Sequence, residues 1–442
     1  MEDSTAQRLI ERTLAGMQEE LRAVVCWLVE QREADLRTLE GGMLERGQRL
    51  VTRTLEAVLA TSPTAVSRET LPCPTCQQPL VDLGPRPKTV HLTCGDLVLR
   101  RACRYCPHCQ QVQAALDAQL GIDQSGRSPR LVEVLALLGT ELPFAPAATR
   151  LARLCGLLVS PSQVQHVTEG VGRTWDAEEA ARVARAWQTG DLPAVEQQAP
   201  WLLVTLDGVM VAEQDGYHEV RCGALAGAEP PAVDRSEPAV TPWRYVVTPA
   251  DVTTFGQRVA LEAGRQGLAT ATQVLVLGDG AHWIWNLAEE HFPQAVQILD
   301  LWHATEHLWA AGRARFGEGD PRVADWVAGT KDRLLAGEVP ALLGEWAAVT
   351  PRDPTAWATE LTYFTNQAQR MAYDQYHAAG YPLGSGAVES ANRHVVGVRV
   401  KQAGMRWSEA GITGVLALRA MLRSDRWDAW WDTHSLPVPL AA

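Results

Sequence analysis

Three acidic residues, Asp207, Asp279 and Glu389, have small neighbouring residues that would let a cation approach the backbone. Asp207 follows an apolar run as Leu-Asp-Gly, and Asp279 follows another as Gly-Asp-Gly. Glu389 lies in GSGAVESANR, where Ser385 is placed to cap the helix that presents it. Converging carboxylates repel one another, and two Mg²⁺ or Mn²⁺ ions about 3.5–4 Å apart would remove that repulsion and activate a water or hydroxyl nucleophile. We predict that all three are catalytic metal ligands, although a single aspartate at a strand end is most often a turn residue.

Four cysteines form two matched knuckles, Cys73-Pro-Thr-Cys76 and Cys106-Pro-His-Cys109, with 29 residues between them. Four thiolates at this spacing can hold a tetrahedral structural zinc ion at about 2.3 Å. The intervening TVHLTCGDLVLRRACRY favours a β-hairpin, so we predict a zinc ribbon. Cys103 lies three residues before Cys106, which leaves open a second knuckle built from that pair. Redox chemistry is the alternative, but a thioredoxin-like motif would not occur twice.

The composition excludes several classes of protein. With 442 residues, 46% hydrophobic and 21% charged, the chain is long enough for about two to four folded domains. No apolar run reaches the ~18–20 residues of a membrane helix, and the start MEDSTAQRLIERTL does not resemble a secretory signal. We therefore expect no membrane partner and a cytoplasmic, nucleoid-associated location. The net charge of −12 argues against a generic nucleic-acid coat, although a local basic patch can still bind DNA.

The hydrophobic pattern divides the chain into four parts. Residues 1–66 are predicted to be helical, with a break at Gly41-Gly42, and form either an ordinary helical hairpin or a dimerising coiled coil. The seam of the first helix consists of Ile10, Leu14, Met17, Leu21, Val24 and Leu28. The other parts are the ribbon at 67–120, helices at 121–196, and an α/β domain with a mixed sheet at 197–442 that contains a helical stretch at about 304–380.

A helix-turn-helix is predicted within the second helical part. Ala147, Leu151 and Leu154 share one helical face, and Gly156 can end that helix. The following SPSQ, residues 160–163, is a capping box with proline at the first helical position. An αα-corner is the alternative, because such corners are common. The outward side chains that could reach base edges are Ser162, Gln165, His166 and Glu169.

The C-terminal part reverses the charge of the rest of the chain. Seven Lys and Arg stand against two acidic residues from Asn392 to Arg426, directly after Glu389. We predict a phosphate-binding surface, with a solvated helix face as the alternative. Trp407 is either a core residue or a stacking platform for a base. The DNA contacts that we expect here are Arg393, Arg399, Lys401 and Arg406.

Together these motifs give the chain a resemblance to a known family. From the knuckles to the C-terminus it resembles bacterial insertion-sequence DDE transposases of the Kra type, which are related to Mutator-like elements. The resemblance rests on LDGVM, VLGDGAHWIW and YPLGSGAVESANRHV followed by KQAGMRW, and on Asp300-Leu-Trp-His303, similar to a (C/D)-x-x-H signature. It implies an RNase H-like core with a helical insertion at 304–380, and Mg²⁺-dependent cleavage and joining of double-stranded DNA at transposon ends and target. Asp300 and His303 would support the metal ligands, and a homo-oligomer would form on DNA.

Two other activities remain open. A related RNase H-like nuclease would cut DNA without joining it. His303-Ala-Thr-Glu306-His307 also matches H-x-x-E-H, the inverted zinc-protease motif, with Glu306 as general base. A protease would leave the two Asp-Gly strands, the ribbon and the basic C-terminal helices without a role, and a helix that packs its flanking tryptophans is the simpler explanation of this motif.

Overall fold

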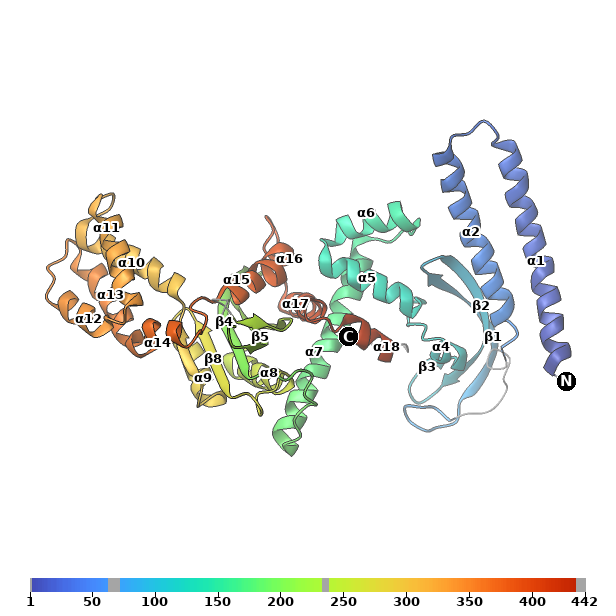
Figure 1. The fold of residues 1–442 in the computed structure, drawn as a ribbon. Helices are drawn as coiled ribbons and strands as arrows, with labels where there is room; N and C mark the ends of the chain where they lie inside the picture. The colour runs from blue at the N-terminus through green and yellow to red at the C-terminus, as the bar shows by residue number, and fades with distance from the viewer. Residues whose placement is uncertain (1, 63–71, 233–237, 435–442) are drawn as a thin grey trace. The chain divides into compact units, whose positions relative to one another are not determined.

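The computed structural model of the chain describes residues 2–62, 72–232 and 238–434 (Figure 1). These residues fall into two compact units, which divide between 174 and 175 and again between 427 and 428, so that 428–434 belong with the N-terminal unit. The predicted boundary at 66/67 lies outside the described residues. In the described ranges we find no helix that is both long and apolar enough to cross a bilayer.

The first unit begins with a helical hairpin. Its helices are α1 (Glu2–Glu30) and α2 (Leu36–Leu59). Asp35 caps α2 by accepting a 2.9 Å hydrogen bond from the backbone of Thr38. The predicted break at Gly41-Gly42 is wrong, since both glycines lie inside α2. Gly42 instead makes room for the Trp27 ring of α1, because a Cβ there would lie 2.2 Å from that ring.

A three-stranded antiparallel sheet follows, in the order β1-β2-β3. Leu92 pairs with Gly95, so a two-residue turn joins β1 and β2 and the expected hairpin is present. Its core is small and apolar, with Leu97 and Leu99 of β2 packed near Leu116. The bounds are β1 (Val81–Leu92), β2 (Gly95–Cys106), β3 (Gln111–Gln113) and the short helix α4 (Ala115–Gln119).

Three helices complete the first unit, and the last of them continues into the second. Gly156 ends α6 in the left-handed conformation, with φ +67°. Ser160 and Gln163 form the reciprocal capping box at the start of α7, with hydrogen bonds of 2.8 and 3.2 Å. Leu154, expected on the inner face of α6, is 72% exposed. The bounds are α5 (Pro129–Glu141), α6 (Phe144–Cys155) and α7 (Pro161–Thr189).

The second unit is built on a mixed sheet, which confirms the expected α/β class. Its strand order is β6-β5-β4-β8-β9, with β7 also paired to β5. Strands β4, β8 and β9 run parallel, whereas β5 is antiparallel to β4, β6 and β7. The bounds are β4 (Trp201–Ala212), β5 (Tyr217–Glu229), β6 (Ala239–Val240), β7 (Arg244–Thr248), β8 (Gln273–Gly278) and β9 (Val296–Leu299).

Helices cover both faces of this sheet. Phe255 and Val259 of α8 pack where Leu206 meets Gly223, so α8 covers the face that carries Leu206. Because neighbouring residues of a strand point to opposite faces, Asp207 faces the other layer, where the C-terminal helices lie. The bounds are α8 (Val252–Arg265), α9 (His282–His291), α15 (Gly386–Ala391), the π-helix η2 (Asn392–Gly397), α16 (Val398–Val400) and α17 (Glu409–Arg423). The last helix, α18 (Trp427–Thr433), begins at the final residue of this unit and otherwise belongs to the first unit.

A group of helices stands between β9 and α15 along the chain, where Figure 1 shows it as a compact cluster beside the sheet. Trp326, Trp346, Trp357 and Phe364 pack together in its core, with ring centres 5.1–6.2 Å apart. The bounds are α10 (Leu301–Phe316), α11 (Arg322–Leu335), α12 (Val339–Ala347), α13 (Pro354–Gln367), the 3₁₀ turn η1 (Ala368–Arg370) and α14 (Tyr373–Ala378).

Candidate functional site

Asp207 and Asp279 stand at the same level of two neighbouring parallel strands. Thr205 of β4 pairs with Leu277 of β8, and each aspartate lies two residues further along its chain. The two carboxylates therefore project at the same edge of the sheet. Asp279 follows the end of β8, as expected. Asp207 does not end its strand, because β4 continues to Ala212 and pairs Asp207 with Cys222 of β5.

The Asp207 carboxylate is held in a partly buried, negatively charged setting. One oxygen accepts a 2.7 Å hydrogen bond from the Gly208 backbone, and the other accepts one of 2.5 Å from the Asn392 amide. Burial and the nearby charges of Asp279 and Glu389 raise the pKa of Asp207 to about 6, against the effect of the Gly208 hydrogen bond. A site that disfavours the charge of a carboxylate in this way gains stability when a cation binds to it.

The buried Asp300 forms an ion pair with the partly buried His303 beside these carboxylates. The fully buried Asp300 caps α10 by accepting a 2.8 Å hydrogen bond from the His303 backbone, and its Oδ1 lies 3.2 Å from the ring Nδ1 of His303. The hydrogen bond to Asp300 raises the pKa of His303 to about 9, with further contributions from Asp279 and Asp207. Although burial opposes it, hydrogen bonds from His303 and Ser385 lower the pKa of Asp300 to about 2.

Glu389 reaches the same place from α15. Its carboxylate is exposed, and ligand atoms of Asp300, His303 and Glu389 lie within 4.8 Å of one another. Among the described residues, no such group joins Glu389 to Asp207 or Asp279. The expected side-chain cap by Ser385 is wrong, because that side chain makes no capping hydrogen bond. The backbone N–H of Ser385 donates to the second oxygen of Asp300 instead, which ties the start of α15 to the end of β9. The α-helix changes into a π-helix at Asn392, three residues after Glu389.

Several site residues were not singled out by the sequence. Asn392 lies three residues after Glu389 and thus on nearly the same helical face, a spacing that could have revealed it. Tyr363 and Gln367 of α13 have no such signal. Tyr363 donates a 2.7 Å hydrogen bond to the Asp279 carbonyl, and the buried Gln367 donates one of 2.9 Å to the Gly280 carbonyl. The helical cluster therefore holds the loop that carries the second aspartate.

The two histidines of the H-x-x-E-H pattern have different partners. His303 pairs with Asp300, whereas the Nδ1 atom of His307 lies 2.7 Å from Glu360 and its ring stacks on Tyr363 at 3.6 Å. In the described part of the chain, none of the groups of potential metal ligands includes both histidines. A zinc protease of the H-x-x-E-H type would need both histidines to bind the same ion.

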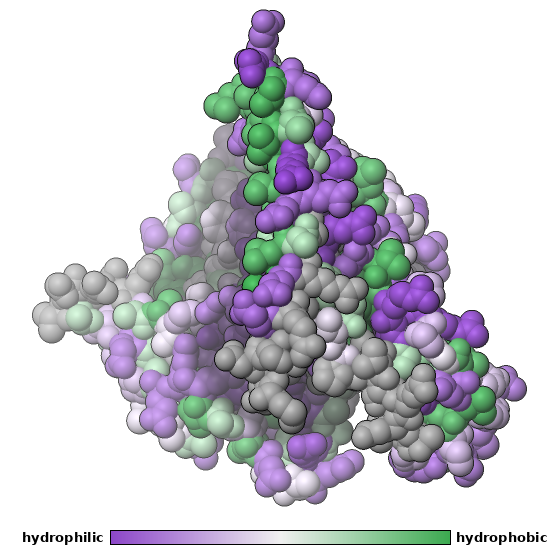
Figure 2. Space-filling view, turned by 90° about the vertical axis from the view of Figure 1, so that its right-hand side faces the viewer, coloured by the Kyte–Doolittle hydropathy of each residue, from purple (hydrophilic) through white to green (hydrophobic). Residues whose placement is uncertain are grey.

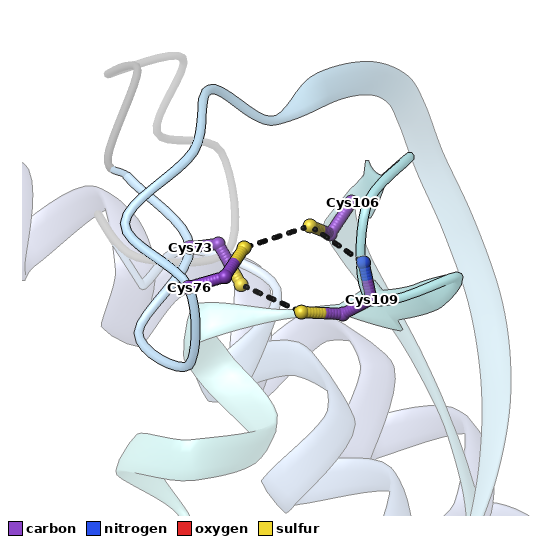
Figure 3. Close-up of side chains that lie close together, drawn as sticks. All are labelled: Cys73, Cys76, Cys106 and Cys109. Carbon is purple, nitrogen blue, oxygen red and sulfur yellow. Dashed lines mark hydrogen bonds between the residues drawn. The ribbon is translucent and has the colours of Figure 1, made fainter.

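The four knuckle cysteines meet at one point, with their side chains directed toward one another (Figure 3). The Cys73 and Cys109 sulfurs are 3.9 Å apart, and those of Cys76 and Cys106 are 3.5 Å apart. Four sulfurs at about 2.3 Å from a tetrahedral ion would be about 3.8 Å from each other, so this arrangement could hold a metal ion. Cys103 does not belong to this group, since its sulfur contacts the Arg101 carbonyl.

The thiols of this cluster ionise unequally. A hydrogen bond from the Cys76 backbone lowers the pKa of Cys73 to about 6. Contacts with the Cys76 and Cys106 thiols, together with burial, raise the pKa of Cys109 to about 12. The Gln113 amide donates a 3.3 Å hydrogen bond to the Cys73 sulfur. Four thiolates cannot coexist here without a cation, which is the chemical property of a metal site.

The residues expected to contact DNA differ in exposure. Ser162, Gln165 and His166 are exposed on α7, and the Gln165 amide donates a 2.8 Å hydrogen bond to Glu169. Arg393, Lys401 and Arg406 are exposed as well.

Arg399 contradicts the prediction that it contacts DNA. It is fully buried, with its guanidinium 5.0 Å from the centre of the Trp407 ring. Trp407 is itself a core residue, 7% exposed, whose indole donates to the Val400 carbonyl at 3.0 Å. The predicted basic surface therefore loses Arg399, and also two more of the seven counted. Arg419 donates to backbone carbonyls, and Arg426 donates to the buried Glu262 carboxylate.

The chain was compared with models of protein families and with curated proteins, and neither comparison finds a match.

Proposed function

We propose that the protein is a DNA transposase of an insertion sequence, with an RNase H-like catalytic core in residues 197–442. The observation that carries this proposal is the placement of Asp207 and Asp279 at one level of adjacent parallel strands, with the Glu389 helix tied to Asp207 through Asn392. The strand order, with a parallel β4-β8-β9 half and an antiparallel β5-β7 half, also supports it. The three carboxylates then act on one phosphodiester group.

Asp207, Asp279 and Glu389 would hold Mg²⁺ or Mn²⁺. Their donor set fits such ions, because it consists of carboxylate oxygens and one of them already has a raised pKa. Two bound ions would activate a water or 3′-hydroxyl and stabilise the leaving oxygen. The chain's own residues do the positioning: Asn392 orients Asp207, and Asp300 joins the start of α10 to the start of α15 through the Ser385 backbone.

Recognition of double-stranded DNA is assigned to other parts of the chain. The cysteine cluster would hold a structural zinc ion and stabilise the ribbon. The capped start of α7 would act as the recognition helix of a helix-turn-helix, with the exposed Gln165 and His166 contacting base edges. Arg393, Lys401 and Arg406 would contact phosphates.

The test is metal-dependent cleavage of a labelled duplex that carries the terminal inverted repeats flanking the gene. Glu389→Gln should reduce cleavage by several orders of magnitude while the duplex is still bound, because the change removes a metal ligand but little recognition surface. Glu306→Gln is the matched control: this exposed glutamate lies on α10 near the site, and its loss should leave cleavage intact. Full cleavage by the Glu389 variant would refute the assignment.

Two parallel assays separate the rival activities. Transfer of the cleaved 3′ end into a target plasmid distinguishes a transposase from a nuclease that only cuts. A casein digest tests the zinc-protease alternative, for which Glu306 rather than Glu389 would be essential. Casein hydrolysis that is lost only in the Glu306 variant would establish the protease.

A further inference from the structure

The helical hairpin carries a long apolar surface that is exposed to solvent among the described residues of its own unit. Figure 2 turns this side of the first unit toward the viewer, with hydrophobic side chains running along the hairpin. Leu21 and Val25 of α1 are 54% and 51% exposed, and Val51 of α2 is 47% exposed. We call the following set the apolar face: Ile10, Leu14, Leu21, Val25, Val29, Leu36, Met43, Leu44, Val51, Leu55 and Val58.

The two helices present these side chains on the same side of the hairpin. Successive residues of a helix are turned by 100°, so Val24, Leu21 and Val25 follow one another around α1 as one apolar sector. Val24 at one edge of this sector is buried, and Val25 at the other edge is half exposed. Its buried part faces α2, and its exposed part is turned by roughly 90° to one side. The same construction for the antiparallel α2 places Val51 on that side too. The hairpin thus has one continuous apolar face made by both helices.

Other contacts already hold the hairpin together. Trp27 of α1 fills the space beside Gly42, and the Arg46 guanidinium lies 4.0 Å from the centre of the Trp27 ring. On its opposite side, α2 is fixed to the remainder of the first unit: Glu56 accepts a 2.6 Å hydrogen bond from the Val98 backbone, and the Gln48 amide donates one of 2.8 Å to the Cys155 carbonyl. The apolar face is therefore not needed to fold or to dock the hairpin.

The size of the face matches a stable protein interface. Eleven large side chains at about half exposure present on the order of 800 Å², the area that each partner of a standard interface buries. The largest apolar patch on a typical monomer covers about 300–600 Å². A face of nearly pure aliphatic character, without aromatic anchors, resembles the seam of a helical bundle.

We propose that this apolar face binds the same face of a second copy of the chain, so that two hairpins form a four-helix bundle.

The charges of the two helices favour a crossed arrangement, in which α1 packs on the partner's α2. The sequence of α1 has six acidic residues and three arginines, whereas α2 has four arginines and three glutamates. Pairing α1 with its own copy would bring two acidic helices together, and crossing avoids that repulsion. This proposal does not depend on the enzymatic activity.

The test is the mass of the full-length protein in solution, without DNA. Light scattering and sedimentation equilibrium should give twice the chain mass of 48.3 kDa. The double variants Leu21→Glu/Val25→Glu in α1 and Val51→Glu/Leu55→Glu in α2 should each raise the dissociation constant by roughly 100-fold or more, because each buries uncompensated charge in the bundle.

Ala23→Glu is the matched control, since Ala23 is exposed on α1 outside the apolar face. It should leave the dimer intact. Unchanged zinc content and helicity would show that each variant is folded. A wild-type protein that is monomeric at high micromolar concentration, or a dimer that survives both double variants, would overturn the proposal. Weakening by the α1 variant alone would overturn the crossed arrangement.

Discussion

The Tyr363 hydroxyl donates a hydrogen bond of 2.7 Å to the backbone carbonyl of Asp279. The ring also packs on the next residue, Gly280, which has φ +105° and where a Cβ would lie 2.9 Å from Tyr363. Gln367 fixes the other side of this turn through the Gly280 carbonyl. Two contacts from α13 therefore determine where the Asp279 carboxylate points, and the helical cluster acts as a support for one half of the proposed metal site.

Tyr363→Phe should weaken metal use more than it weakens the fold. Loss of one hydrogen bond costs about 1 kcal/mol, so the thermal midpoint should fall by only a few degrees. Because the Asp279 loop loses a restraint, the Mg²⁺ concentration for half-maximal cleavage should rise by roughly fivefold. Tyr381→Phe is the matched control, since it removes a 3.0 Å hydrogen bond to Gln273 in the same unit. Equal effects of both variants on the Mg²⁺ requirement would contradict the positioning role.

Strand periodicity predicted the sheet better than it predicted the site. The apolar runs before Asp207 and Asp279 are long and β-branched, so the strands and the neighbouring carboxylates could be expected from the sequence. The expectation that this strand ends at Asp207 is wrong, because β4 continues to Ala212. Tyr363 and Gln367 could not be found, because a contact across more than eighty residues depends on how the helical cluster packs and leaves no periodic signal.

The Asp300–His303 pair predicts a stability that depends on pH in a defined direction. The pKa of His303 is raised to about 9, so its stabilisation is complete below about pH 6.5 and is lost as the pH rises through 9. The pKa of Asp300 is lowered to about 2, so its stabilisation is present above about pH 4 and is lost as the pH falls through 2.

His303→Asn should therefore lower the stability by about 1–2 kcal/mol at pH 6, a figure reduced for solvent screening, and by much less at pH 10. The measurement is the thermal midpoint of both proteins at the two pH values, without added Mg²⁺. A gap between the two proteins that is the same at both pH values would show that His303 acts only through packing.

The cysteine cluster predicts which thiols retain zinc. Cys73→Ser should reduce the zinc content from about one ion per chain and destabilise the first unit, because the ion contributes folding energy directly. Cys103→Ala should keep the ion, since the Cys103 sulfur contacts a carbonyl outside the cluster. Elemental analysis of the purified variants, with thermal unfolding in parallel, makes the comparison. Zinc lost from the Cys103 variant would instead assign the second knuckle to the Cys103–Cys106 pair, and zinc kept by the Cys73 variant would remove Cys73 from the metal site.

Counting charges along the C-terminal part overestimated its exposed basic surface, because a sequence count cannot separate arginines that fold the chain from those that remain in solvent. Arg399 is fully buried against Trp407, whereas Lys401, two residues later, is exposed.

These neighbours should respond in opposite ways to the same substitution. Lys401→Ala should leave the thermal midpoint unchanged, weaken binding to all duplexes, and reduce the salt dependence of binding by about one phosphate contact. Arg399→Ala should instead lower the stability by roughly 2–4 kcal/mol, because it leaves a cavity beside the Trp407 indole. Where the Arg399 variant is folded, the salt dependence of its DNA binding should equal that of the wild type.

Binding isotherms at several salt concentrations, with thermal unfolding of both variants, test these two predictions. A reduced salt slope in a stable Arg399 variant would show that this arginine reaches DNA, and an unchanged slope for Lys401→Ala would remove Lys401 from the phosphate-binding surface.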